Sequence, residues 1–201
     1  MAERALHLDD GTKLYVQKYE MTVAEWNRCF HAGACEKEAK PRPGWDAETT
    51  PATEISFEDA QQYVTWLTGA ASHPFRLPSL EEWETMAREV LPEKPDPIFS
   101  DPSLTWASAY LVENLPARAL EPTGSFPETS AGIADLSGSV WEWTQDCYEA
   151  RAADKCSAYH VGGEHVAVIS VFVRDPARGG CAVGAPPAHL GLRLVTERAL
   201  L

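Results

Sequence analysis

Residues 135–143 have the sequence DLSGSVWEW, and they are the most informative stretch of the chain for its fold. A turn is predicted at the start, because Gly138 can adopt backbone conformations that a side chain would resist. Trp141 and Trp143 follow at alternate positions. Since successive side chains of a strand point to opposite faces, one ring is expected on each side of a strand. With seven Trp in 201 residues, we expect most of these rings to fill the core.

Three helices are predicted upstream of this strand, because three short segments begin with a capping box. The boxes pair Thr22 with Glu25, Ser56 with Asp59 and Ser79 with Glu82. The first helix is expected to stop near 31–33, the second at Gly69 and the third at Pro92. An ion pair between Arg76 and Glu84 is expected across the start of the third helix.

The other regular segments are predicted to be strands. Residues 5–19 are typical of a β-hairpin around a Gly turn at 9–12. The apolar run at 166–173 is short enough for a buried strand, and 190–195 is expected to be a terminal strand. Proline-rich loops dominate 91–135. No change in composition divides the chain, so we predict one domain over residues 1–201.

Seven short motifs occur in an order that resembles the formylglycine-generating, or sulfatase-modifying, family. They are YEMTVAEW at 19–26, PATEISFEDA at 51–60, FRLPSLEEWE at 75–84, GSFP at 124–127, DLSGSVWEW at 135–143, RGG at 178–180 and GLRL at 191–194. The resemblance implies an α+β chain with a C-type-lectin-like fold. Such a fold has small twisted antiparallel sheets, two to three helices and long structured loops.

The resemblance does not extend to the family's chemistry. Active members carry two cysteines after the RGG motif, which bind copper and drive oxygen-dependent oxidation of a substrate cysteine to formylglycine. Between Gly180 and Gly191 this chain has a single cysteine, Cys181. A linear Cu(I) site needs two thiolates. We therefore predict no catalytic residue and no copper.

Calcium is disfavoured for a similar reason. In relatives the turn that corresponds to 135–143 supplies Asn and Glu oxygens and backbone carbonyls to Ca²⁺, an ion that takes six to eight oxygen ligands. The matching candidates here are Ser139, Val140 and Glu142, with serine in place of asparagine. The family's second calcium loop would correspond to 116–120, where Arg118 does not suit a cation. We predict no cofactor.

Four residues would carry chemistry if the chain were a diverged enzyme. Cys181 with His189 could form a thiolate–imidazolium couple, and His160 with His165 could hold a transition metal. A Gly-Gly pair between the two latter histidines excludes a helical i, i+4 arrangement. A buried inert thiol and exposed loop histidines explain these residues better.

The cysteines bear on the cellular compartment. Cys29 and Cys35 flank one short polar loop, and Cys147 and Cys156 flank another, so each pair is a disulfide candidate. Cys181 is then left over. Two disulfides favour the periplasm or the extracellular space. The start of the chain lacks the pattern of a signal peptide, and without the disulfides a cytoplasmic location is expected.

Charge and hydropathy exclude two classes of partner. The formal net charge is −13, from 30 acidic and 17 basic residues, so nucleic acid and anionic lipid surfaces are repelled. No apolar run approaches the roughly 20 residues of a membrane-spanning helix, so membrane insertion is not expected.

These observations predict a non-catalytic sulfatase-modifying-factor-like module that binds a protein partner as an accessory or structural subunit. Two alternatives stay open: a diverged metal-dependent oxidase or maturation enzyme, and a lectin-like module that displays a site for a carbohydrate or another ligand. Partner contacts are expected in the loops 42–50, 92–103 and 149–164. The rings proposed as contacts are Trp45, Trp106 and Tyr159.

Overall fold

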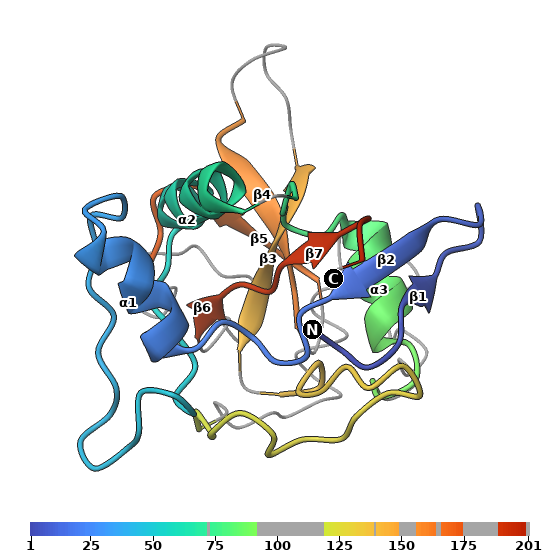
Figure 1. Cartoon of the computed structure of the whole chain (residues 1–201), viewed down its shortest axis with the longest axis horizontal. Coiled ribbons are helices and arrows are strands. Elements are labelled where there is room, and N and C mark those ends of the chain that lie inside the picture. The colour runs from blue at the N-terminus through green and yellow to red at the C-terminus, as the bar shows by residue number, and fades with distance from the viewer. Residues whose placement is uncertain are drawn as a thin grey trace, which may run out of the picture.

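The computed structural model shows three helices and two small sheets in the part of the chain that it describes (Figure 1). The described residues are 1–71, 73–91, 119–138, 140–148, 156–163, 166–174 and 189–199. The elements are β1 (Leu6–His7), β2 (Lys13–Val16), α1 (Val23–His31), α2 (Phe57–Ala70), α3 (Leu80–Ala87), β3 (Trp141–Cys147), β4 (Ala158–Gly162), β5 (Ala167–Ser170), β6 (Leu190–Gly191) and β7 (Val195–Thr196).

The strands form one sheet in the order β1-β2-β7 and another in the order β5-β4-β3-β6. The first sheet joins strands from the two ends of the chain, so the terminal segments lie close together in Figure 1. All pairs are antiparallel except β3 with β6, where Trp141 faces Leu190 in a parallel register. The predicted small antiparallel sheets are confirmed except at this pair, where the long connection between β3 and β6 allows the crossover that a parallel neighbour requires.

All three predicted capping boxes are confirmed, and each helix starts where its box predicts. α2 ends at Ala70, one residue past the predicted Gly69. α3 ends at Ala87 rather than at Pro92, since the chain then turns and the N–H groups of Val90 and Leu91 both donate to the Ala87 carbonyl.

The predicted partner of Arg76 was wrong. Its guanidinium donates two hydrogen bonds to Glu82, at 2.6 and 2.7 Å, and one to Glu197 at 3.0 Å. Glu82 also accepts from the backbone N–H of Ser79 as the last residue of its capping box. That box turns the Glu82 carboxylate back towards the helix start and hence towards Arg76, whereas Glu84 is exposed on the helix.

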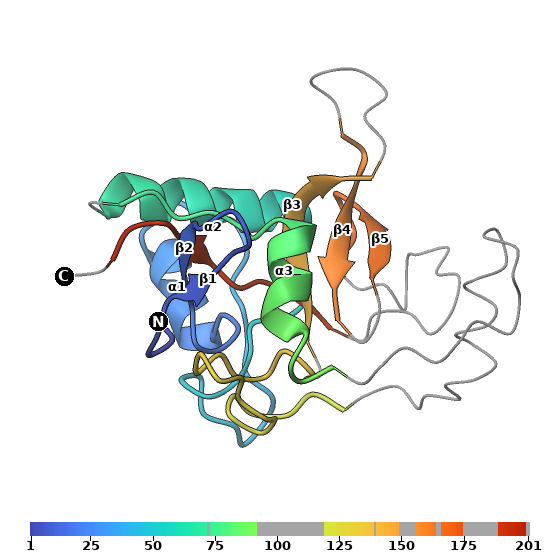
Figure 2. The ribbon, with the colours of Figure 1, turned by 90° about the vertical axis from the view of Figure 1, so that its right-hand side faces the viewer.

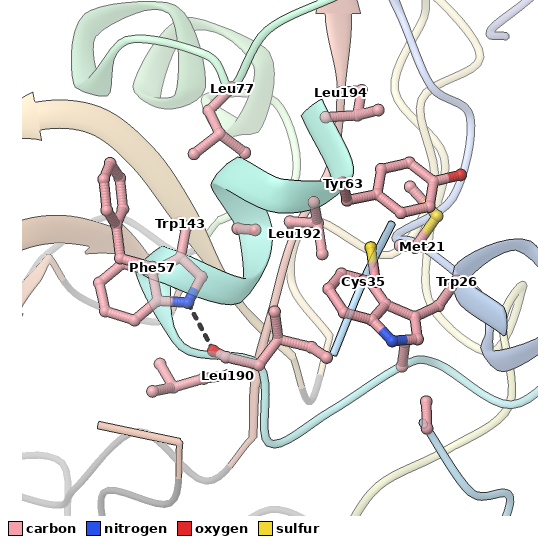
Figure 3. Packing of buried hydrophobic residues seen from close by; sticks show 14 of the residues in the cluster. Met21, Trp26, Cys35, Phe57, Tyr63, Leu77, Trp143, Leu190, Leu192 and Leu194 are labelled. Carbon is pink, nitrogen blue, oxygen red and sulfur yellow. Dashed lines mark hydrogen bonds between the residues drawn. The ribbon is translucent and has the colours of Figure 1, made fainter. Parts of the chain in front are cut away.

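Tryptophan rings fill much of the core, as predicted. Trp26 stacks on Tyr63 with ring centroids 5.4 Å apart, which joins α1 to α2. The indole N–H of Trp143 donates to the carbonyl of Ile55 at 2.7 Å, the dashed line in Figure 3. The same view shows apolar side chains of the segment after β6, Leu192 and Leu194, within this cluster. Segments from both halves of the chain therefore share one interior.

β4, which contains His160 and ends at Gly162, was not predicted from the sequence. A Cβ atom on Gly162 would overlap the indole of Trp83, and one on Gly163 would overlap Trp141. The Gly-Gly pair therefore marks a strand end on which two large rings pack directly, and His160 lies in a strand rather than in the predicted loop.

The predicted buried strand over 166–173 is shorter and more exposed than expected. β5 covers only Ala167–Ser170 and lies at the edge of its sheet (Figure 2). Val168 in this strand is exposed. Phe172 follows the strand and is 71% exposed. An edge strand has a neighbour on one side only, so apolar residues there are not all covered.

Both predicted disulfides are confirmed. Cys29–Cys35 joins the end of α1 to the following loop, and Cys147–Cys156 joins β3 to the residues before β4. Their Cα atoms lie 5.3 and 5.8 Å apart. Two disulfides indicate an oxidising compartment. In the described parts of the chain, every helix is too short or too polar to span a bilayer.

Candidate functional site

The first candidate is the buried end of β3, where the sequence predicted a weakened calcium turn. Arg193 is fully buried there, and its guanidinium donates to Glu142 at 2.8 and 3.1 Å. It also donates to the carbonyls of Gln17, Lys18 and Ala134 at 2.6–2.8 Å. An arginine has five N–H donors, and these contacts engage all three guanidinium nitrogens.

Glu142 does not fit the role of a calcium ligand. Its Oε2 atom accepts from the indole N–H of Trp83 at 2.9 Å, and both carboxylate oxygens accept from Arg193. Val140 is buried at the same turn, while Ser139 lies outside the described residues. Within the described ranges there is also no group of three or more His, Cys, Asp or Glu side chains arranged to hold a metal.

Glu20 is a second buried carboxylate beside Arg193. It is 2% exposed, and its Oε2 atom has no hydrogen-bond partner, because the nearest Arg193 nitrogen is 3.8 Å away. Burial raises the pKa of Glu20 to about 8, and the negative charges of Asp135 and Glu142 add to this rise. Arg193 opposes the rise only in part, since Glu142 already engages its charge.

Asp135 connects this network to the GSFP motif. Its carboxylate accepts from the backbone N–H groups of Gly124 and Phe126 at 2.6 and 2.9 Å. Asp135 itself has a φ of 65°. The predicted turn is present at 136–138, but Gly138 is not among the glycines with a positive φ. Gly138 is needed for space, because a Cβ atom there would lie 2.6 Å from the Asp135 carbonyl oxygen.

The second candidate is a surface pocket of about 360 Å³ that several distant segments form together. One wall comes from the loop after α1, another from the segment before α2, and the rest from single residues elsewhere in the chain. The lining residues are Lys37, Glu38, Lys40, Pro41, Arg42, Thr50, Pro51, Thr53, Glu54, Leu120, Arg174 and His189. In the sequence, Arg174 directly precedes and His189 directly follows segment 175–188, which contains the RGG motif and Cys181.

Two cations of the pocket are held by the protein. The ammonium of Lys37 contacts the carbonyls of Thr53 and Glu54 and lies 3.5 Å from the Glu54 carboxylate. Burial lowers the pKa of Lys37, and Glu54 offsets this only in part. Arg174 donates through Nε and Nη2 to both oxygens of Asp59, each at 2.6 Å.

Asp59 anchors Arg174 from the first turn of α2. It is 1% exposed, and its carboxylate also accepts from the backbone N–H and hydroxyl of Ser56. Burial alone would raise the pKa of Asp59, but the hydrogen bonds from Arg174 and Ser56 lower it below its usual value. Asp59, which completes the capping box of α2, thus also holds Arg174 in the wall of the pocket.

The structure brings only some of the predicted site residues together. Trp45 is partly buried, with the guanidinium of Arg42 5.5 Å from its ring centroid, and Arg42 lines the pocket as His189 does. Tyr159 stacks on Phe57 and packs against the core, so less of its ring faces solvent than a contact residue would offer. Trp106, His165 and Cys181 lie outside the described residues.

His160 does not line the pocket. Its Nδ1 atom is buried without a hydrogen-bond partner, and its ring meets Tyr148 edge-on at 5.6 Å. Among the residues described, no second metal-binding side chain groups with it.

Sequence reasoning missed the charged residues that matter most in both places. Arg193 carried a usable signal, because a charge between two leucines in a predicted strand has to be paired when it is buried. Glu20, within the first motif, carried no comparable signal. The pairing of Asp59 with Arg174 joins residues 115 positions apart, which no local pattern reveals.

Comparisons with known proteins agree with the motif order. The model of the sulfatase-modifying factor enzyme 1-like domain matches residues 2–198. The inactive C-alpha-formylglycine-generating enzyme 2 of Mus musculus is 31% identical over 112 residues, which cover 52% of this chain and 34% of that protein. The formylglycine-generating enzyme of Mycobacterium tuberculosis is 30% identical over 105 residues, which cover 47% and 32%. The chain thus spans about a third of the length of these relatives.

Solved structures confirm the fold. PvdO from Pseudomonas aeruginosa superposes with a TM-score of 0.63 at 18% identity, covering 94% of this chain and 82% of that one. CarF superposes with a TM-score of 0.60 at 16% identity, covering 98% and 93%. The predicted α+β, C-type-lectin-like scaffold is therefore confirmed.

Proposed function

Because this chain belongs to the sulfatase-modifying factor enzyme 1-like family, we propose that it keeps the family scaffold as a non-catalytic module that binds a partner protein. Its role would be that of an accessory or structural subunit. The observation that carries the proposal is the single cysteine, Cys181, between Gly180 and Gly191. One thiolate does not make the two-thiolate copper site that the family resemblance implies for active members.

The use of the motif residues supports this proposal. Glu142, from the motif at 135–143, and Arg193, from the motif at 191–194, pair with each other inside the protein. Asp135 holds the backbone of a third motif. These contacts lie inside the protein and stabilise the scaffold, which supports a structural role for these motif residues.

We propose that the module carries no calcium and no copper and works in the periplasm or outside the cell. The pairing of Glu142 with Arg193 supports the first part for calcium, since a cation there would have to displace a buried guanidinium. The two disulfides support the second part.

A partner-capture experiment tests the binding role. The tagged full chain is expressed in its native source under oxidising conditions and purified at physiological salt, with size and stoichiometry measured by light scattering. We expect a defined heteromeric complex that a tagged unrelated acidic protein does not retain. A monomer that elutes alone would contradict the proposal.

An activity experiment tests the absence of catalysis. The full chain is loaded with Cu(I) and incubated with a cysteine-containing peptide and oxygen, and aldehyde is measured by mass spectrometry. The Mycobacterium tuberculosis enzyme serves as the positive control. We expect no aldehyde and no stoichiometric copper. Aldehyde or bound copper that disappears in Cys181→Ser would establish the diverged oxidase instead.

A further inference from the structure

The pocket carries an excess of positive charge in a strongly acidic protein. Its lining includes four basic side chains, those of Lys37, Lys40, Arg42 and Arg174, and two carboxylates, Glu38 and Glu54. The chain as a whole has 30 acidic and 17 basic residues. Basic side chains thus outnumber carboxylates in the lining itself, and the nearby carboxylates of Asp59, Glu36 and Glu58 offset part of the charge of Arg174. Physiological salt screens charges beyond about 8 Å, so a ligand in the pocket senses the charges that line it and those in direct contact with the lining, such as Asp59.

The four cations divide into two fixed and two accessible groups. Lys37 and Arg174 are held by backbone carbonyls and by Asp59, so their positions are set before any ligand arrives. The side chain of Lys40 is 79% exposed, and its only ion pair in the described chain is a 3.9 Å contact with Glu38. Exposed pairs of this length contribute little, so Lys40 can exchange its partner at small cost.

Arg42 is the second accessible cation. Its guanidinium lies against the ring of Trp45, and it forms no ion pair within the described residues. Stacking on an aromatic ring restricts an arginine without using its N–H donors, which stay available to a planar carboxylate. The loop 42–50, in which the sequence predicted partner contacts, therefore contributes a pre-oriented donor to the pocket.

We propose that this pocket binds an acidic segment of the partner protein, with a glutamate or aspartate carboxylate placed between the fixed pair, Lys37 and Arg174, and the accessible pair, Lys40 and Arg42. This inference rests on the proposed binding function and names the chemistry of its partner. A volume of about 360 Å³ is at the lower end of the roughly 300–1,000 Å³ of ligand pockets, which suits a few side chains of an extended segment.

A protein segment fits better than a nucleic acid. A polyphosphate chain extends beyond the pocket over a surface whose overall charge is −13 and would be repelled there. A peptide with one or two carboxylates places its charge inside the pocket alone. Charge complementarity over such a short range gives specificity more than affinity, so we expect weak binding by the isolated segment.

Fluorescence anisotropy tests the proposal with the full chain at physiological salt. The probe is a labelled peptide with two glutamates separated by glycine, and its matched control has glutamines in their place. We expect the glutamate peptide to bind at least about tenfold more tightly. In the double variant Lys40→Gln with Arg42→Gln, we expect this preference to fall at least about fivefold.

The control variant is Lys13→Gln with Arg198→Gln. It removes the same charge from two exposed residues that do not line the pocket, and binding should not change. Equal binding of the two peptides, or an equal loss in both double variants, would overturn the proposal. All four residues are exposed or partly exposed, and thermal unfolding checks that each variant folds.

The two proposals fail separately. If the native partner is retained equally by wild type and by Lys40→Gln with Arg42→Gln, the pocket is not its docking site, but the binding function stands. If the glutamate peptide binds and no partner is captured, the pocket is confirmed as a carboxylate site and the accessory role is wrong.

Discussion

The interior at β3 and the surface pocket each contain an arginine paired with a buried carboxylate. They differ in whether the guanidinium keeps N–H donors that a ligand could use. Arg193 is 0% exposed and donates to Glu142 and three carbonyls. The Arg174 side chain is 50% exposed, and Asp59 takes only its Nε and Nη2 donors. The carboxylates themselves are alike, each 2% exposed at the side chain.

This difference separates a pair with a purely internal role from a pair that can still contact a ligand. A buried pair whose donors are all used stabilises one arrangement and offers nothing to a ligand, and removing one partner leaves an uncompensated charge. A pair with one face at a pocket holds its arginine in place and still presents positive charge. Both residues of the first pair lie in family motifs, whereas the second pair joins Asp59, from the motif at 51–60, to Arg174, which lies outside the motifs.

The largest effect is expected from Arg193→Met. Loss of the guanidinium removes the donors that it supplies to the carbonyls of Gln17, Lys18 and Ala134 and leaves the Glu142 carboxylate with only the indole N–H of Trp83, which should lower the free energy of unfolding by about 3–5 kcal/mol. Urea unfolding measures this loss. Arg198→Met, at an exposed position, should change stability by less than about 0.5 kcal/mol. Similar values for both would show that the network does not hold the fold.

Glu20→Gln should change how stability depends on pH. The pKa of Glu20 is about 8 in the folded protein and ordinarily 4.5, so the folded state keeps a proton that the unfolded chain releases. Stability therefore falls as pH rises from about 4.5 to 8, by up to about 1.4 kcal/mol per pH unit, and the loss is complete above pH 8.

Glutamine at position 20 does not ionise, so the free energy of unfolding of the variant should rise relative to that of the wild type as pH increases from about 4.5 to 8. Urea unfolding at pH 5, 7 and 9 measures the difference. Asp59 and Glu82 have lowered pKa values, so their contributions to the pH dependence of stability fall at lower pH and do not mask that of Glu20. Parallel pH profiles for wild type and variant would contradict the buried, protonated state of Glu20.

Gly162→Ala tests the packing that supports the interior network. The added methyl group would overlap the ring of Trp83, which donates to Glu142, and overpacking of this kind costs about 1–3 kcal/mol. Gly69→Ala is the matched control, because its methyl group meets nothing within 4 Å in α2. That change should be neutral or stabilise by up to about 1 kcal/mol. Thermal unfolding of both variants should separate them clearly.

The smallest stability effect is expected from Arg174→Gln. Asp59 keeps its hydrogen bonds from Ser56, so we expect a loss of about 1–2 kcal/mol at pH 7. The loss should shrink as pH falls through the lowered pKa of Asp59, where the carboxylate is protonated in wild type and variant alike. A loss as large as that of Arg193→Met would remove the distinction between the two pairs.

Much of the local structure could be predicted from the sequence. Each capping box joins residues three positions apart, and each disulfide closes a short loop, so neither depends on distant contacts. The errors lie where distant segments meet. β4 was missed because Gly162 and Gly163 are typical of a loop, whereas here they make room for the rings of Trp83 and Trp141. Arg76 pairs with Glu82 rather than Glu84, because the capping box turns the Glu82 carboxylate towards it.

The sequence by itself determined the family, the helix starts, the net charge and the presence of a lone cysteine after the RGG motif, since all of these lie in composition, short spacing or motif order. Only the tertiary structure decided that Glu142 faces Arg193 and that Lys37, Arg42, Arg174 and His189 surround one pocket. Arg193 meets Gln17 across 176 positions, and Arg174 meets Asp59 across 115. Such contacts depend on how the whole core packs, because burial selects a partner by its position in space and not by its distance along the chain.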